Sequence, residues 1–159
     1  MIAKNRKIVC TLGVIFFLIL LYFVFVYKDY SNIHEVNTSE LDFSTQFKCN
    51  IDEVKELDHN HLCITGWAIK EKENIERIEC YIALKNKNTK KVYKIKTRRI
   101  DRPDVTEFYN DGFNYNGSGF AAVLDKQKFE KGSYEIVIIY RNNQNNILGL
   151  ANKDIIISS

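Results

Sequence analysis

Two hydrophobic patterns divide this chain. Residues 8–27 form an apolar run without a charged side chain, whereas residues from 47 onward alternate between apolar and polar positions. An unbroken run of this length is typical of a membrane-spanning helix, and alternation with a period of two is typical of β-strands. The pattern predicts one N-terminal helix followed by a β-rich domain.

The apolar run has the length of a bilayer span. A helix of twenty residues, at about 1.5 Å per residue, extends about 30 Å, the thickness of the hydrocarbon core. The alternative is a cleaved signal peptide, whose apolar stretch is about 7–15 residues and ends at small residues. This run is longer and is followed by Lys28, Asp29 and Tyr30. We therefore predict an uncleaved anchor in the lipid bilayer.

Basic residues predict the orientation of that anchor. Lys4, Arg6 and Lys7 precede the run, and positively charged flanks remain in the cytoplasm. We expect residues 1–7 to be cytoplasmic, residues 8–27 to cross the cell membrane once, and the C-terminal domain to be extracytoplasmic.

The rest of the chain is predicted to be a linker and one all-β domain. Residues 28–43 are polar with little periodicity, which indicates a linker, and residues 44–159 form the domain. We expect strands at residues 47–52, 62–69, 78–85, 92–100, 120–124, 134–140, 147–150 and 155–157. Pro103 suits the first position of a short helical turn. About seven or eight short strands favour an immunoglobulin-like antiparallel β-sandwich.

Charge argues against nucleic-acid binding. Three of the 23 basic residues precede the anchor, and the other 20 balance 20 acidic residues. A formally neutral domain is unlike a typical nucleic-acid-binding domain. The abundance of Lys, Asn and Ile indicates an AT-rich, bacterial genome.

A local basic cluster follows the third predicted strand. It comprises Lys85, Lys87, Lys90, Lys91, Lys94, Lys96, Arg98, Arg99 and Arg102. On one hairpin, such charge would attract an anionic wall polymer or lipid headgroups. The alternative is a solvated edge strand whose basic side chains prevent aggregation.

Aromatic residues also have two interpretations. A stacking platform for sugars is one, formed by Tyr81, Tyr93, Phe108, Tyr109 and Tyr115. Core packing is the other, and it applies first to Trp67, Phe113 and Phe120 because a small sandwich needs buried rings.

The sequence contains no recognisable catalytic or metal motif. It has no Gly-x-Ser-x-Gly elbow and no Gly-rich phosphate loop. His59, His61 and Cys63 alternate as strand residues do but lack a clear fourth ligand for zinc. Cys49, Cys63 and Cys80 each lie on a predicted strand, with Cys49 and Cys80 on apolar faces. Buried free thiols are one interpretation, and a disulfide between two of the three is the other. We expect no enzyme activity, metal or cofactor.

Several short motifs resemble a known group of modules. Gly66-Trp67-Ala68 is followed by Arg102-Pro103-Asp104-Val105, then by Gly119-Phe120 and by Gly132-Ser133-Tyr134. This order resembles the small β-sandwich modules attached to bacterial glycosyltransferases and to teichoic-acid-type wall-polymer enzymes. The resemblance implies an accessory, carbohydrate-associated role rather than a catalytic one.

These observations together predict a membrane-anchored, non-catalytic accessory module of the bacterial cell envelope. Its partner would be a glycan, an anionic wall polymer or a protein. The predicted ligand-binding residues are Trp67, Tyr93, Arg98, Arg99, Arg102 and Tyr109. The alternative is a structural subunit of a membrane protein complex that binds no glycan.

Overall fold

The computed structural model describes residues 2–31, 33–76 and 78–158, with side chains for residues 12–26, 33–76 and 78–158. The chain divides into two units after residue 32. The first unit is helix α1, Ile2–Ser31, in which apolar side chains such as Phe16 and Phe25 are exposed. No helix among the described residues is long and apolar enough to cross a membrane. The side chains of residues 8–11 and 27, which belong to the predicted span, lie outside the described set.

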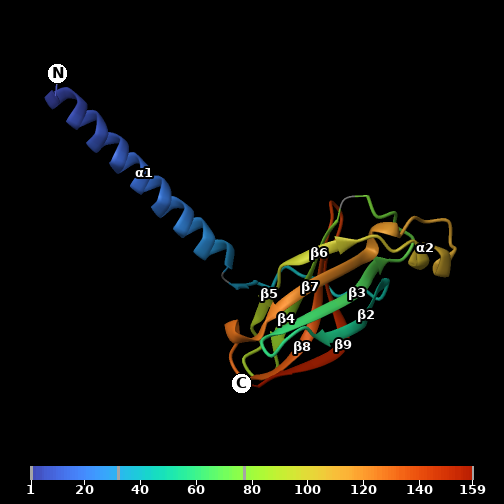
Figure 1. The fold of residues 1–159 in the computed structure, drawn as a ribbon. Coiled ribbons are helices and arrows are strands. Elements are labelled where there is room, and N and C mark those ends of the chain that lie inside the picture. The colour runs from blue at the N-terminus through green and yellow to red at the C-terminus, as the bar shows by residue number, and fades with distance from the viewer. Residues whose placement is uncertain (1, 32, 77, 159) are drawn as a thin grey trace. The chain divides into compact units, whose positions relative to one another are not determined.

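The second unit is built from two antiparallel sheets that pack face to face (Figure 1). One sheet has the order β1-β5-β4-β8-β9, formed by His34–Glu35, Val92–Lys94, Glu79–Asn86, Gly132–Arg141 and Asn146–Ile157. The other has the order β2-β3-β7-β6, formed by Phe47–Glu56, His61–Lys70, Gly119–Asp125 and Thr97–Ile100. The short helices are α2 (Pro103–Tyr109), η1 (Asn116–Ser118) and η2 (Lys126–Lys128). The expected all-β sandwich is confirmed.

The core lies between the two sheets, as the period-two pattern predicts. Ile64 and Leu124 project inward from one sheet, and Ile82, Ile136 and Ile138 project inward from the other. Phe120 is also buried there, as expected for a core ring. Full burial of each such side chain contributes about 1.5–3 kcal/mol, so this interior stabilises the sandwich.

The predicted strand at residues 92–100 is wrong in one respect, because the chain crosses between the sheets within it. β5 ends at Lys94 in one sheet, and β6 starts at Thr97 in the other. The crossing is fixed by the Ile95 amide, which donates to the Ile82 carbonyl at 2.9 Å, and by the Ile82 amide, which donates to Thr97 Oγ1 at 2.9 Å. Lys94 and Arg98 therefore project from opposite outer faces of the sandwich.

The predicted linker is shorter than residues 28–43, because residues from Ile33 belong to the sandwich unit. Leu41 is buried on the outer face of the five-stranded sheet. The Asp42 amide donates to Asn146 O, and the Leu148 amide donates to Asp42 O. We call residues 33–43 the strap, since they cross this face and cover Val137, Ile139 and Leu148.

The outer face of the four-stranded sheet is covered only at one end. Pro103 occupies the start of α2, as predicted, and α2 ends at Asn110 with a φ of 42°. Val105 of α2 and Tyr115 bury Ile69 and Ile75 in a second, smaller core. Trp67 and Phe113, which were also expected in the core, pack half-buried at its margin.

Candidate functional site

A polar groove lies at one end of the sandwich, between the β3–β4 loop and the tip of the β8–β9 hairpin. Its two adjoining hollows have volumes of about 400 Å³ and about 520 Å³. This is the size range of small-molecule sites, about 300–1,000 Å³. We call it the end groove, lined by Glu73, Asn74, Glu76, Ile78, Glu79, Arg99, Arg141, Asn142, Asn143 and Gln144.

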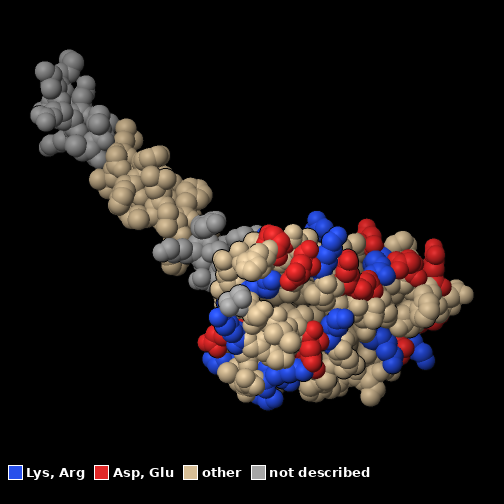
Figure 2. Space-filling view, turned by 60° about the horizontal axis from the view of Figure 1, so that its bottom comes forward, with Lys and Arg blue, Asp and Glu red and all other residues tan. Residues whose placement is uncertain are grey.

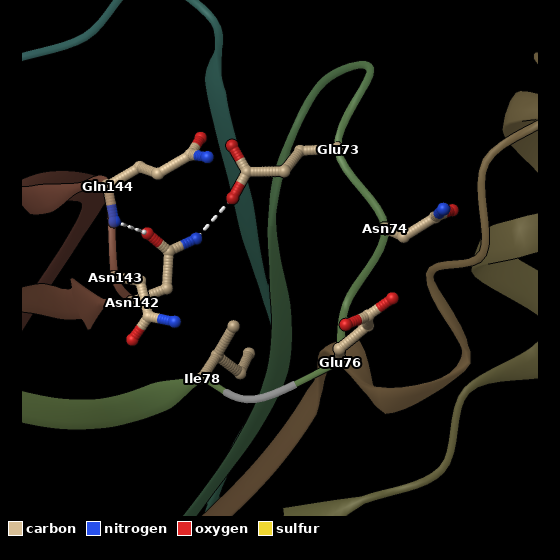
Figure 3. Close-up of a pocket in the computed structure, with 7 residues that line it drawn as sticks. All are labelled: Glu73, Asn74, Glu76, Ile78, Asn142, Asn143 and Gln144. Carbon is tan, nitrogen blue, oxygen red and sulfur yellow. Dashed lines mark hydrogen bonds between the residues drawn. The ribbon is translucent and has the colours of Figure 1, made fainter.

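The hairpin side of the end groove is fixed by Asn142. Its Oδ1 accepts from the backbone amides of Gln144 at 2.9 Å and Asn145 at 2.8 Å. Its Nδ2 donates to Glu73 on the opposite loop, as Figure 3 shows. An Asn side chain that bonds its own backbone two residues on stabilises a tight turn. The side-chain amides of Asn143 and Gln144 are therefore attached to a backbone that these hydrogen bonds hold in place.

The loop side is fixed by ion pairing and by the second core. Lys70 Nζ lies 3.1 Å from Glu73 and donates to Asn145 Oδ1 at 2.7 Å. Asn74 Oδ1 accepts from the Asn114 amide at 2.7 Å, and Ile75 is buried next to it. Because its carboxylate contacts Lys70 and two Asn amides, Glu73 is fully paired in place.

Asn74, Glu76 and Ile78 also line the groove on the loop side. Figure 3 shows Glu73 reaching towards the hairpin, whereas the Asn74 side chain, whose Oδ1 accepts from the Asn114 amide, points away from it. Glu76 is exposed and makes no hydrogen bond or ion pair within the described part of the chain. Its carboxylate is available to accept hydrogen bonds from a ligand.

The second hollow continues the groove towards β6. Arg99 Nε donates to Gly117 O at 2.8 Å, and Arg141 Nε donates to Asn146 Oδ1 at 2.8 Å. Glu79 is directly opposite Arg141 in the sheet register. Among the described residues, the lining has three Glu and two Arg side chains, and one of the Glu side chains, Glu73, is paired with Lys70.

The Tyr140 hydroxyl lies beneath the groove. Tyr140 is fully buried, with its hydroxyl near the Glu73 carboxylate and the Asn142 side chain. Burial, followed by the neighbouring Glu73 carboxylate, raises the pKa of this phenol.

Three of the predicted ligand-binding residues lie at the α2 end of the four-stranded sheet. The rings of Trp67 and Tyr109 meet edge to face at 6.0 Å, and Tyr109 also contacts Tyr115 at 5.5 Å. Arg102 donates to Asp104 at 2.7 Å and to Asp52 at 2.5 Å. Edge-to-face packing leaves these rings without a shared flat surface.

The other three predicted residues do not share one surface. Tyr93 packs edge to face with Phe129 at 6.0 Å, against the main core. Arg98 projects from the outer face of β6 beside Ala121. Arg99 alone lines the end groove. The six residues therefore do not form one site.

The basic cluster is also dispersed, because the chain crosses between the sheets within it. Lys87 pairs with Asp154, Lys91 pairs with Glu35 at 2.8 Å, and Lys94 Nζ lies 3.1 Å from the centroid of the Tyr81 ring. Figure 2 shows positive and negative side chains interspersed over the face in view. No single basic surface results from the residues 85–102.

The proposed aromatic platform separates in the same way. Tyr115 is fully buried, Tyr81 is covered by Lys94, and Phe108 is 81% exposed on α2. Phe108 contacts Tyr109 edge to face at 5.3 Å. One exposed ring remains from the set, which is too little for a stacking surface.

The three domain cysteines are free thiols. Burial raises the pKa of Cys49 to about 11, and burial with the neighbouring Cys49 raises the pKa of Cys80 to about 12. His61 Nδ1 lies 2.9 Å from Asp58 at the β2–β3 turn. Within the described residues, no group of three His, Cys, Asp or Glu side chains is arranged to hold a metal ion.

Sequence patterns did not reveal the end groove. Residues 142–146 read as a turn, although five consecutive amide side chains exceed what a turn requires. This run of amide side chains is the feature of the sequence that could have indicated a polar binding site. The opposite wall comes from residues 73–79, and no local pattern connects these two segments. No protein-family model, curated protein or solved structure matches the chain.

Proposed function

We propose that this protein is a membrane-anchored, non-catalytic module of the bacterial cell envelope that binds an uncharged glycan in the end groove. The observation that carries the proposal is an open hollow of about 400 Å³ whose two walls, the β3–β4 loop and the β8–β9 hairpin, contribute Glu73, Glu76, Asn142, Asn143 and Gln144. These groups offer both donors and acceptors on a backbone held by internal hydrogen bonds.

Sugar hydroxyls suit this set of side chains. Each hydroxyl donates one hydrogen bond and accepts others, so it pairs well with amides and with a carboxylate. Ile78 at the base provides a small apolar surface for the carbon face of a ring. A fixed site loses less conformational entropy on binding, which favours affinity for a flexible polar ligand.

The charge of the groove favours an uncharged glycan over an anionic wall polymer. Among the described lining residues, two Arg side chains balance Glu76 and Glu79, and Lys70 pairs with Glu73. Elsewhere, Lys87, Lys91 and Arg102 are neutralised by acidic neighbours. A polyanion would therefore meet no excess of positive charge in the described groove and little around it.

The order of the strands supports an immunoglobulin-like assignment as part of this proposal. In that fold one sheet has the order A-B-E-D and the other contains C-F-G. Lettering β2 to β9 in chain order as A, B, C, C′, D, E, F and G gives A-B-E-D and C′-C-F-G here. The resemblance to accessory sandwich modules of wall-polymer enzymes is in line with this order.

The proposed anchor is residues 8–27, with the sandwich outside the cytoplasm. The supporting observations are the uncharged run, the basic residues before it, and the helical backbone of Ile2–Ser31. Alkaline carbonate extraction of cells that express the full chain should leave it in the membrane pellet. Recovery of the full chain in the soluble fraction would contradict the anchor.

A glycan-binding assay tests the function. The full chain in detergent micelles is titrated with uncharged envelope glycans at low and moderate salt, and binding should persist at both. Glu76→Gln and Asn143→Ala should each weaken binding, since neither side chain holds the fold. Glu107→Gln and Asn88→Ala are the matched controls, because both residues are exposed and lie outside the groove. If the glycan affinity is the same in the Glu76→Gln and Asn143→Ala variants as in the unchanged chain, or if no glycan binds, the structural-subunit alternative is favoured.

A further inference from the structure

A second hollow lies on the outer face of the four-stranded sheet, beyond the part covered by α2. Cys63 of β3 is paired with Val123 of β7, and Ala121 of β7 is paired with Arg98 of β6. The hollow has a volume of about 340 Å³. We call it the outer hollow, with Cys63, Ala121 and Val123 as its floor and Lys96 and Arg98 on one side.

The floor of the outer hollow is apolar where a solvated sheet face would be polar. β7 is an inner strand of its sheet, yet Val123 in its middle is 52% exposed. An antiparallel sheet with one solvated face normally carries polar side chains there. Val123 is the exposed apolar side chain of this floor, Cys63 is half-buried and Ala121 is buried.

The rim of the outer hollow is basic. The Arg98 side chain is exposed and forms no hydrogen bond or ion pair with any described residue. Lys96 lines the same side, and Lys55 faces Cys63 from β2, with Glu53 facing Thr65 two residues away. Three basic groups and one acidic group therefore surround the apolar floor, which favours a negatively charged partner.

We propose that the outer hollow is the docking surface for an acidic segment of a partner protein. The segment places an aliphatic side chain over Val123 and a carboxylate against Arg98. Charge complementarity selects the carboxylate, because Arg98 can bind it with two parallel hydrogen bonds. Among the described strands β6 lies at the edge of its sheet and pairs with β7 alone, and an extended segment would lie along its other edge.

Cys63 supplies a native reporter for this surface. It is a half-exposed thiol in the floor of the hollow, whereas burial raises the pKa of Cys49 to about 11 and that of Cys80 to about 12. A maleimide at neutral pH will therefore modify Cys63 before Cys49 and Cys80, which pack against the main core. Mass spectrometry of the modified peptides identifies the site.

The experiment compares the alkylation rate of Cys63 in two preparations of the full chain. One is native membranes, and the other is the purified chain in vesicles of lipid extracted from those membranes. We expect alkylation about tenfold slower in native membranes, because the docked segment covers the thiol. Arg98→Glu should restore the fast rate in native membranes by repelling the carboxylate. Lys48→Glu, a charge reversal at another exposed site, should leave the slow rate unchanged.

Three results would overturn the proposal. Equal rates in both preparations would show that nothing covers the hollow. A slow rate in the protein-free vesicles would show that lipid covers it. Protection that survives Arg98→Glu would show that no carboxylate is held there. None of these depends on glycan binding, since Arg98 and Cys63 lie outside the end groove.

Discussion

The two outer faces of the sandwich have similar apolar floors but different covers. On the five-stranded sheet, Val137 and Ile139 lie beneath the strap and Leu41. On the four-stranded sheet, Val123 lies in a similar mid-strand position with no cover. The outer face of the five-stranded sheet therefore belongs to the interior of the unit, while the outer face of the four-stranded sheet remains available for binding. The difference separates apolar residues that stabilise the fold from those that are free to bind.

Removing the strap contact should have the largest effect on stability. Leu41→Ala should lower the free energy of unfolding by about 3 kcal/mol, since it leaves a cavity over Val137 and Leu148. Phe43→Ala is the matched control, because this neighbouring side chain is 70% exposed and should change stability by about 0.5 kcal/mol or less. Denaturant unfolding of residues 33–159 measures both. Equal small effects would mean that the strap does not seal the face.

The three thiols should differ next in reactivity. A pKa raised from 9.0 to about 11 lowers the thiolate fraction of Cys49 at pH 8 by roughly 100-fold, and Cys80 is shifted further. The open face should therefore react first at Cys63. Rapid labelling of all three in the folded chain would contradict this ordering.

The raised pKa of Cys49 also predicts how the stability of the sandwich depends on pH. Below pH 9 the thiol is protonated in both the folded and the unfolded chain, so its contribution to the free energy of unfolding is constant. As pH rises from 9 towards 11 the unfolded thiol ionises first, and the free energy of unfolding falls.

Matched valine substitutions compare the two faces directly. Val137→Ala should cost about 2 kcal/mol, since two buried carbons are lost and the strap cannot fully collapse onto the space. Val123→Ala should cost about 0.5 kcal/mol or less, because that side chain already contacts solvent. Thermal and denaturant unfolding of the pair provide the measurement. A large cost at Val123 would mean that the outer hollow is covered within the chain itself.

The arginines should show the smallest difference. Arg102→Met should cost about 1 kcal/mol, because it removes charged hydrogen bonds to Asp52 and Asp104, and the loss should shrink at high salt. Arg98→Met should leave stability nearly unchanged, since Arg98 has no partner among the described residues. Unfolding at low and high salt measures both variants. A stabilising role for Arg98 would weaken its assignment to partner binding.

The sequence predicted the layers of the fold well because the strands carry a clear period of two. The strands around Ile64, Ile82 and Ile138 follow from it, and so does the helical start at Pro103. The same regularity gives no sign of the crossing at residues 95–96. Tyr93 in β5, Ile95 at the crossing and Thr97 in β6 all point inward. The alternation of the sequence therefore continues while the chain passes from one sheet to the other.

Contacts between distant segments could not be read from sequence in the same way. Leu41 is one of four apolar residues in the strap, with Ile33, Val36 and Phe43, and no periodicity marks it out. Its packing against β8 and β9 reveals its role. The end groove joins Glu73 and Asn142, which are 69 residues apart. The predicted ligand-binding residues Tyr93, Arg98 and Arg99 would be neighbours on one hairpin, but the crossing at residues 95–96 places Tyr93 in one sheet and the two arginines in the other.

The most direct test of the account is to locate glycan binding on the sandwich. Backbone amide chemical shifts of the isotopically labelled full chain in micelles would be followed by NMR during titration with an uncharged envelope glycan. The account predicts saturable changes confined to the two walls of the end groove, residues 73–79 and 141–145, and their loss in Glu76→Gln. Changes centred on Trp67 and Tyr109, or no changes at any glycan concentration, would contradict the assignment of the end groove as the binding site.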